Sequence, residues 1–133
     1  MKTLRGILLC NPANIRINSD IFVGEVKPSN DVDFKTFKSF TYGIRALMRI
    51  LLTYYSKYNC DTVTKVITRY APSIENDTKS YISFVCKHMH IEPNTILRLN
   101  IKADLFPLVE AICKFESTYV PTEATLINAF LRL

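Results

Sequence analysis

The acidic residue Glu116, near the C-terminal end of a predicted helix, has a spacing suited to acid catalysis. Leu105, Val109 and Ile112 precede it at offsets of four, three and four residues, so its side chain continues their apolar stripe. Burial favours the neutral form of a carboxyl group, and a protonated carboxyl at a helix end can protonate a glycosidic oxygen. We therefore expect Glu116 to be a general acid. The alternative is a carboxylate that reaches solvent or forms an ion pair.

A second polar cluster is predicted in the turn between two helices, over residues 69–78. Two carboxylates stand there among hydroxyl and amide groups, which could hold a water molecule or a sugar. Capping the next helix would equally explain Asp77 and Thr78. The cluster supplies two predicted catalytic residues, Glu75 and Asp77, and three predicted substrate-binding residues, Tyr70, Asn76 and Thr78.

A third group follows the N-terminal segment, where Asn11, Asn14 and Arg16 surround Pro12. The amides can both donate and accept hydrogen bonds, so we expect these three polar side chains to bind substrate. Ordinary loops are also rich in asparagine, and such a loop is the alternative.

Residues that ligate metals do not form a set in this sequence. His88 and His90 project from different sides of a helix. The four cysteines are widely separated, which suits reduced thiols packed as small apolar side chains. There is no Gly-rich phosphate loop and no motif for an activated Ser or Cys. We expect neither a metal nor a cofactor.

Charge is unevenly distributed along the chain. The 17 Lys and Arg outweigh the 12 Asp and Glu, and residues 1–70 carry 11 basic and 5 acidic side chains. This half could face an anionic polymer, or simply be a solvated surface. Arg45 and Arg49 lie on a helix whose apolar stripe indicates core, which disfavours nucleic acid as a partner. No apolar run is long enough for a membrane span, and no signal peptide is recognised.

The elements that must position these groups fit a single domain over residues 1–133 that is mainly α with a small β-hairpin. Residues 1–19 are expected to be irregular. The runs 21–27 and 32–37 are β-prone and flank a turn, so they predict the hairpin.

Five helices are predicted from apolar periodicity. The central one is capped by Thr41 and has a stripe formed by Ile44, Leu47, Met48, Leu51, Leu52 and Tyr55. The other signals are Asp61 and Pro72 bounding the second helix, Asn76 or Asp77 capping the third, Asp104 capping the fourth with Pro107 in its first turn, and Pro121-Thr122 before the fifth.

Several motifs together carry a resemblance: Arg5-Gly6-Ile7, Asn11-Pro12, Asn14-Ile15-Arg16, Tyr42-Gly43-Ile44-Arg45-Ala46-Leu47, Tyr70-Ala71-Pro72 and Glu75-Asn76-Asp77-Thr78. The chain resembles, over residues 5–117, small phage and prophage proteins usually labelled virion structural proteins. It departs from them where Leu8, Leu9 and Cys10 replace polar residues and Ala13 replaces a glycine. A non-catalytic virion protein that binds other virion proteins is one function implied by this resemblance.

A weaker resemblance points to an enzyme. The Asn turn, the hairpin and Tyr70-Ala71-Pro72 look like glucosaminidases of the lysozyme superfamily, and Phe115-Glu116-Ser117 looks like the Glu-Ser pair of lytic transglycosylases. The hypothesis is a circularly permuted lysozyme-like domain that cleaves the glycan strand of peptidoglycan, as a hydrolase or a lytic transglycosylase. Such a protein would be made in the host cytoplasm and act in the virion or at the cell wall.

Overall fold

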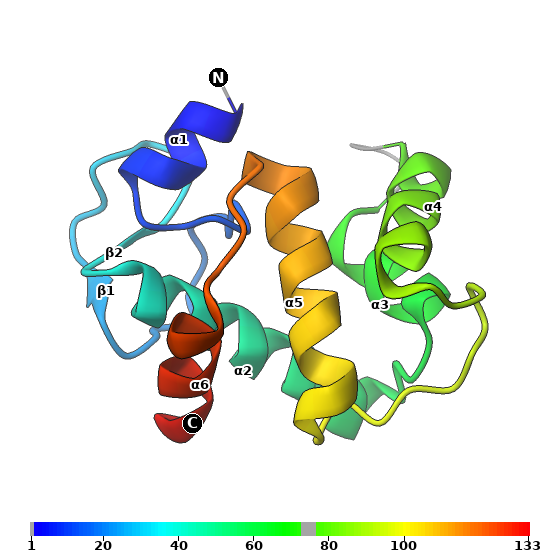
Figure 1. Cartoon of the computed structure of the whole chain (residues 1–133). Coiled ribbons are helices and arrows are strands. Elements are labelled where there is room, and N and C mark those ends of the chain that lie inside the picture. Colours follow the sequence, from blue (N-terminus) through cyan, green and yellow to red (C-terminus); the bar gives the residue numbers. More distant parts are fainter. Residues whose placement is uncertain (1, 73–76) are drawn as a thin grey trace. The chain divides into compact units, whose positions relative to one another are not determined.

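The computed structural model describes residues 2–72 and 77–133 (Figure 1). These residues form six helices and one two-stranded antiparallel sheet, which confirms the prediction of a mainly α chain with a small hairpin. The chain divides into two compact units, residues 1–49 with 112–133, and residues 50–111. That the two units form a single domain stays a prediction.

The first unit opens with helix α1 (Lys2–Leu8), so the expectation of irregular structure over residues 1–19 is wrong for this part. Its apolar Leu4 and Leu8 are exposed, and Gly6 interrupts the segment, so no buried stripe marks a helix in the sequence. A glycine at position 6 lets α1 pack closely against Ser117. A Cβ at this position would lie 2.8 Å from the Cβ of Ser117.

The hairpin is present but much shorter than predicted. Strand β1 (Glu25–Val26) pairs antiparallel with β2 (Thr36–Phe37), with Glu25 opposite Phe37 and Val26 opposite Thr36. The predicted strands over residues 21–27 and 32–37 therefore both begin four residues too early.

Lys35 explains why the strands are short. Its backbone N–H donates to the carbonyl of Ile15 at 3.0 Å, so this stretch bonds to the segment after α1 and not to the segment before β1. Its side chain is fully buried, and Nζ donates to both carboxylate oxygens of Glu25 at 3.0 Å and to the carbonyl of Asp20 at 2.9 Å. The segment before β1 thus wraps around the Lys35 side chain as a loop.

Helix α2 (Phe40–Tyr58) begins in the first unit and continues into the second. Thr41 lies inside its first turn, so the predicted cap is wrong: the carbonyl of Ser39 accepts from the Gly43 N–H at 3.1 Å. The predicted apolar stripe is confirmed, and its fully buried members are Ile44, Leu47, Met48 and Leu51.

In the second unit, α3 (Val63–Tyr70) and α4 (Thr78–Met89) pack side by side (Figure 1). Thr62 caps α3, since its hydroxyl accepts from the Lys65 N–H. Asp61, the predicted cap, instead accepts from the Lys65 ammonium at 3.1 Å. The hydroxyl lies one residue closer to the helix, where it can reach the N3 amide.

Helix α4 confirms Asp77 as its cap, whereas Asn76 lies outside the described residues. Helix α5 (Lys102–Ser117) starts before Asp104, which is therefore not its cap, and whose carboxylate accepts from the Arg98 N–H at 2.7 Å. Pro107 is consequently inside the helix and not in its first turn. Helix α6 (Glu123–Leu131) has the predicted start, with Thr122 as cap.

Candidate functional site

The turn that follows α1 is held by the side chain of Asn11. Its Nδ2 donates to the carbonyls of Ile15 and Lys35, both at 2.9 Å, and its Oδ1 accepts from the Ile15 N–H at 2.9 Å. Asn11 is buried, so these bonds replace water and fix the turn against the hairpin segment. This geometry makes Asn11 a residue that shapes the turn, and its binding of substrate stays a prediction.

Asn14 joins this turn to Glu116, 102 residues later in the chain. Its Nδ2 donates to the Glu116 carboxylate at 3.2 Å and to the Glu116 backbone carbonyl at 3.0 Å. Its Oδ1 accepts from Nε of Arg5 at 3.2 Å. Arg5, Asn14 and Glu116 thus form a chain of hydrogen bonds from α1 to the last turn of α5, inside the first unit.

Glu116 is buried, as its place in the apolar stripe predicted, with 7% of its surface exposed. The residues that precede it in the stripe, Leu105, Val109 and Ile112, are fully buried. A carboxyl group in these surroundings is held in one orientation by the Asn14 amide. Asn14 would therefore orient the Glu116 carboxylate. That Glu116 is a general acid stays a prediction.

The neighbouring Ser117 fastens the end of α5 to the same turn. Its hydroxyl donates to the carbonyl of Pro12 at 2.7 Å and also lies 3.2 Å from that of Cys113. Gly6 of α1 and Gly43 of α2 allow the close approach, because a Cβ on Gly43 would lie 2.1 Å from the carbonyl oxygen of Cys10. Backbone from three helices therefore surrounds the Asn turn.

Two arginines cover the ring of Phe34 beside this turn. The guanidinium carbon of Arg5 lies 3.6 Å from the ring centre and that of Arg16 lies 4.8 Å from it. Arg16 is exposed, so its guanidinium is accessible to a polar ligand, and its binding of substrate stays a prediction. The cation–π contact holds its position without using its N–H groups.

The second predicted cluster belongs to the other unit. Asp77 is exposed and accepts from the N–H and hydroxyl of Ser80, at 3.1 and 2.8 Å, and these bonds lower its pKa. Thr78 donates to the carbonyl of Ala71 at 2.8 Å, which links the end of α3 to the start of α4. Tyr70 is half-buried at the end of α3. Glu75 and Asn76 lie outside the described residues.

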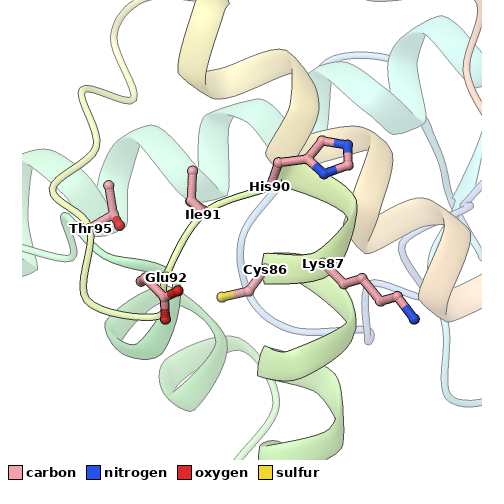
Figure 2. Close-up of a pocket in the computed structure, with 6 residues that line it drawn as sticks. All are labelled: Cys86, Lys87, His90, Ile91, Glu92 and Thr95. Carbon is pink, nitrogen blue, oxygen red and sulfur yellow. The ribbon is translucent and has the colours of Figure 1, made fainter.

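His90 ends α4 in a left-handed conformation, and a shallow pocket of about 510 Å³ opens beside it. In Figure 2 the Cys86 thiol points toward Glu92, while Lys87 and the His90 ring are directed away from them. Burial and the Glu92 carboxylate raise the pKa of Cys86, so its thiol stays neutral and is a poor nucleophile. These side chains do not converge into a nucleophile and base.

Within residues 2–72 and 77–133, no three His, Cys, Asp or Glu side chains gather in a way that could hold a metal ion. All four cysteines are free thiols, and Cys60, Cys86 and Cys113 are buried as predicted for small apolar side chains. None of the helices in these ranges combines the length and apolarity that crossing a bilayer requires.

Two sets of interactions escaped sequence reasoning. One is the buried pair Lys35 and Glu25, for which alternating polarity in a β-prone run gives no signal. The other is the stacking of Arg69 on Tyr58, 3.5 Å from the ring centre. The aromatic and basic residues lie 11 positions apart in different helices, so only the fold brings them together.

No protein-family model matches the chain. Among curated proteins, Protein P5 of Pseudoalteromonas phage PM2 is 42% identical over 93 residues. The chain is similar to a phage protein. The alignment covers 68% of this chain and 58% of Protein P5, so the chain spans less than two thirds of that relative. This match supports the expected likeness to phage proteins.

Proposed function

We propose that this chain is a phage protein that cleaves the glycan strand of peptidoglycan, with a lysozyme-like arrangement in which Glu116 is the general acid. The observation that carries the proposal is the Glu116 carboxylate, buried at the end of an apolar helix and bonded to the Asn14 amide at 3.2 Å. Enzymes of this class place a carboxylic acid in just such a desolvated site.

The reaction needs one proton for the glycosidic oxygen and one hydroxyl group that bonds to the anomeric carbon of the sugar. Protonated Glu116 gives its proton to the glycosidic oxygen as the bond from that oxygen to the anomeric carbon breaks. In a hydrolase, water then adds to the anomeric carbon and loses a proton, which returns to Glu116. In a lytic transglycosylase, a hydroxyl of the same sugar closes on that carbon and returns a proton to Glu116. No further reactant is required in either case.

The other predicted residues have supporting roles. Asp77, whose pKa is lowered by its bonds to Ser80, stays ionised and suits the stabilisation of positive charge better than proton donation. Glu75 is proposed to place water, together with the binding residues Tyr70, Asn76 and Thr78. Arg16 and the Asn turn are proposed to contact the strand near Glu116.

The test is wall cleavage by the wild type and by Glu116→Gln, in a zymogram or a dye-release assay. Glutamine keeps an oxygen for the Asn14 amide but cannot donate a proton as an acid, so the rate should fall by about 10² to 10⁴ with the fold unchanged. Glu110→Gln on the same helix is the matched control and should cleave normally. Cleavage that survives Glu116→Gln would refute the assignment of the acid.

The second candidate is a non-catalytic virion protein that binds other virion proteins. It is favoured by the exposed apolar residues of α1, where Leu4, Ile7 and Leu8 lie on one helix face, and by Val32, which is 89% exposed. Here the Asn14 to Glu116 bonds would only hold the fold together. A folded protein without activity on walls from several bacteria would favour this function.

A further inference from the structure

A second shallow pocket, of about 460 Å³, lies in the unit formed by residues 50–111. Its lining comes from the end of α2, the segment that follows and α3. Its lining combines two cations, three hydroxyl groups and a thiol: Lys65, Arg69, Tyr58, Thr64, Thr68 and Cys60. None of these residues belongs to a predicted catalytic or substrate-binding site.

Arg69 is the group in this pocket that is ready to bind an anion. Its guanidinium carbon lies 3.5 Å from the ring centre of Tyr58 and 5.3 Å from that of Tyr54. A guanidinium that stacks on a ring uses the face of its plane, so its N–H groups stay available for a two-pronged bond to a carboxylate. In the part of the chain that the structure describes, no carboxylate pairs with Arg69.

Lys65 attracts an anion less strongly than Arg69 does, because the Asp61 carboxylate forms an ion pair with the Lys65 ammonium at 3.1 Å. Among residues 2–72 and 77–133, the lining therefore has one positive charge that no carboxylate pairs with. The whole unit is also close to neutral, with 7 basic and 6 acidic residues over residues 50–111, a net charge of +1. Binding a polyanion such as nucleic acid requires many cationic side chains on the protein. This pocket has too few of them, so it suits a ligand with a single negative group.

The remaining lining suits a sugar. Tyr58 is 49% exposed, which leaves ring surface for the apolar face of a saccharide, and the Thr68 hydroxyl can bond to its hydroxyl groups. Thr64 already donates to the carbonyl of Pro93 at 3.1 Å and so remains as an acceptor.

We propose that this pocket binds a carboxylate-bearing saccharide, with Arg69 on the carboxylate and Tyr58 against the ring. Resting on the proposed function, this ligand is an N-acetylmuramic acid unit with a free lactyl carboxylate, as on glycan strands from which the peptides have been removed. The substrate class of the enzyme is then the peptide-free strand.

Titrations followed by amide chemical shifts test the pocket directly, with N-acetylmuramic acid, N-acetylglucosamine, acetate and inorganic phosphate as separate probes. N-acetylmuramic acid should bind at least tenfold more tightly than N-acetylglucosamine, which has the same ring without the carboxylate, and more tightly than acetate, which has the carboxylate without the ring. Equal binding of the two sugars would overturn the proposal, and so would tightest binding of phosphate.

Variants separate the pocket from the catalytic proposal. Arg69→Gln should weaken N-acetylmuramic acid at least tenfold, and Arg69→Lys should weaken it as well, because lysine keeps the charge but loses the planar fork. Lys57→Gln, an exposed cation on α2 outside the pocket, should leave binding unchanged. Unaltered binding in Arg69→Gln would refute the site.

Glu116→Gln should bind the sugar like the wild type, because Glu116 does not line this pocket. Binding that depends on Arg69 in a protein without wall cleavage would leave the pocket standing and remove the proposed function. Wall cleavage without binding that depends on Arg69 would leave the proposed function standing and remove the pocket.

Discussion

At the residue scale, Glu116 and Asn14 show how much chemistry can be recognised from spacing. The apolar offsets before Glu116 predicted its burial correctly, and the Asn turn was recognised as a polar group. Their contact could not be predicted, because 102 residues separate the two side chains and nothing local records the pairing. Periodicity reports which face of an element is buried, not which element covers it.

Replacing Asn14 by aspartate tests this contact with little change in shape. Aspartate cannot donate to Glu116, and it places a second carboxylate against the first. We expect a loss of roughly 1–3 kcal/mol in the free energy of unfolding at pH 7.

Urea denaturation of the wild type and the variant at pH 7 measures the effect. Asn18→Asp is the control, since Asn18 is exposed and uses its Oδ1 only as an acceptor, for the Asp20 N–H. An Asn14→Asp protein as stable as the wild type would show that the Asn14 amide does not stabilise Glu116.

At the element scale, helices with a buried stripe were predicted and those without one were missed. Helix α2 was predictable because Ile44, Leu47 and Leu51 form a buried stripe. Helix α1 has no such stripe, since Leu4 and Leu8 are exposed and Gly6 interrupts it. Helix ends were less predictable. Asp61 and Thr62 are both good caps, and only the geometry of the first turn selects Thr62.

Gly43→Ala should destabilise the protein although it lies within a helix. At an exposed helical site this change would stabilise by about 0.5–1 kcal/mol. Here the new Cβ would lie 2.1 Å from the Cys10 carbonyl oxygen, and we expect a net loss on the order of 3 kcal/mol. Thermal unfolding compares it with Ser56→Ala, an exposed site on the same helix. A Gly43→Ala protein as stable as wild type would mean that the Asn turn does not pack on α2.

The buried pair Lys35 and Glu25 should hold the hairpin more than its four strand residues do. Glu25→Gln leaves a buried ammonium without its counter-charge, so we expect a loss of about 3–5 kcal/mol. Adding Lys35→Met removes that charge and should recover part of the loss. Both changes are measured by chemical denaturation.

The exposed pair Lys65 and Asp61 provides the matched cycle. Lys65→Met and Asp61→Asn should couple by less than about 0.5 kcal/mol, because solvent screens these two charges. Equal coupling in the two cycles would show that Lys35 is not desolvated.

At the scale of the whole molecule, sequence reasoning recognised the mainly α composition and the likeness to phage proteins, since both follow from features spread along the chain. It could not foresee that the two polar clusters fall in different compact units. The Asn turn and Glu116 belong to one unit and Asp77 to the other, because α5 returns its last turn to the N-terminal segment. Chain order gives no signal for that return.

The two units should nevertheless unfold in one transition, which is how a single domain behaves. The boundary falls inside α2, between Arg49 and Ile50, and inside α5, between Ala111 and Ile112. A helix gains stability cooperatively along its length, so melting one half of α2 or α5 weakens the other half.

Two substitutions, one in each unit, make this measurable. Thr62→Ala removes the cap of α3 and should cost about 1 kcal/mol, and Glu25→Gln acts in the hairpin. Native-state hydrogen exchange should show that each change lowers the protection of buried amides in both units, at Ile44 and at Val85, by the same free energy. If Glu25→Gln lowers protection at Ile44 and leaves Val85 unaffected, the chain consists of two domains and not one.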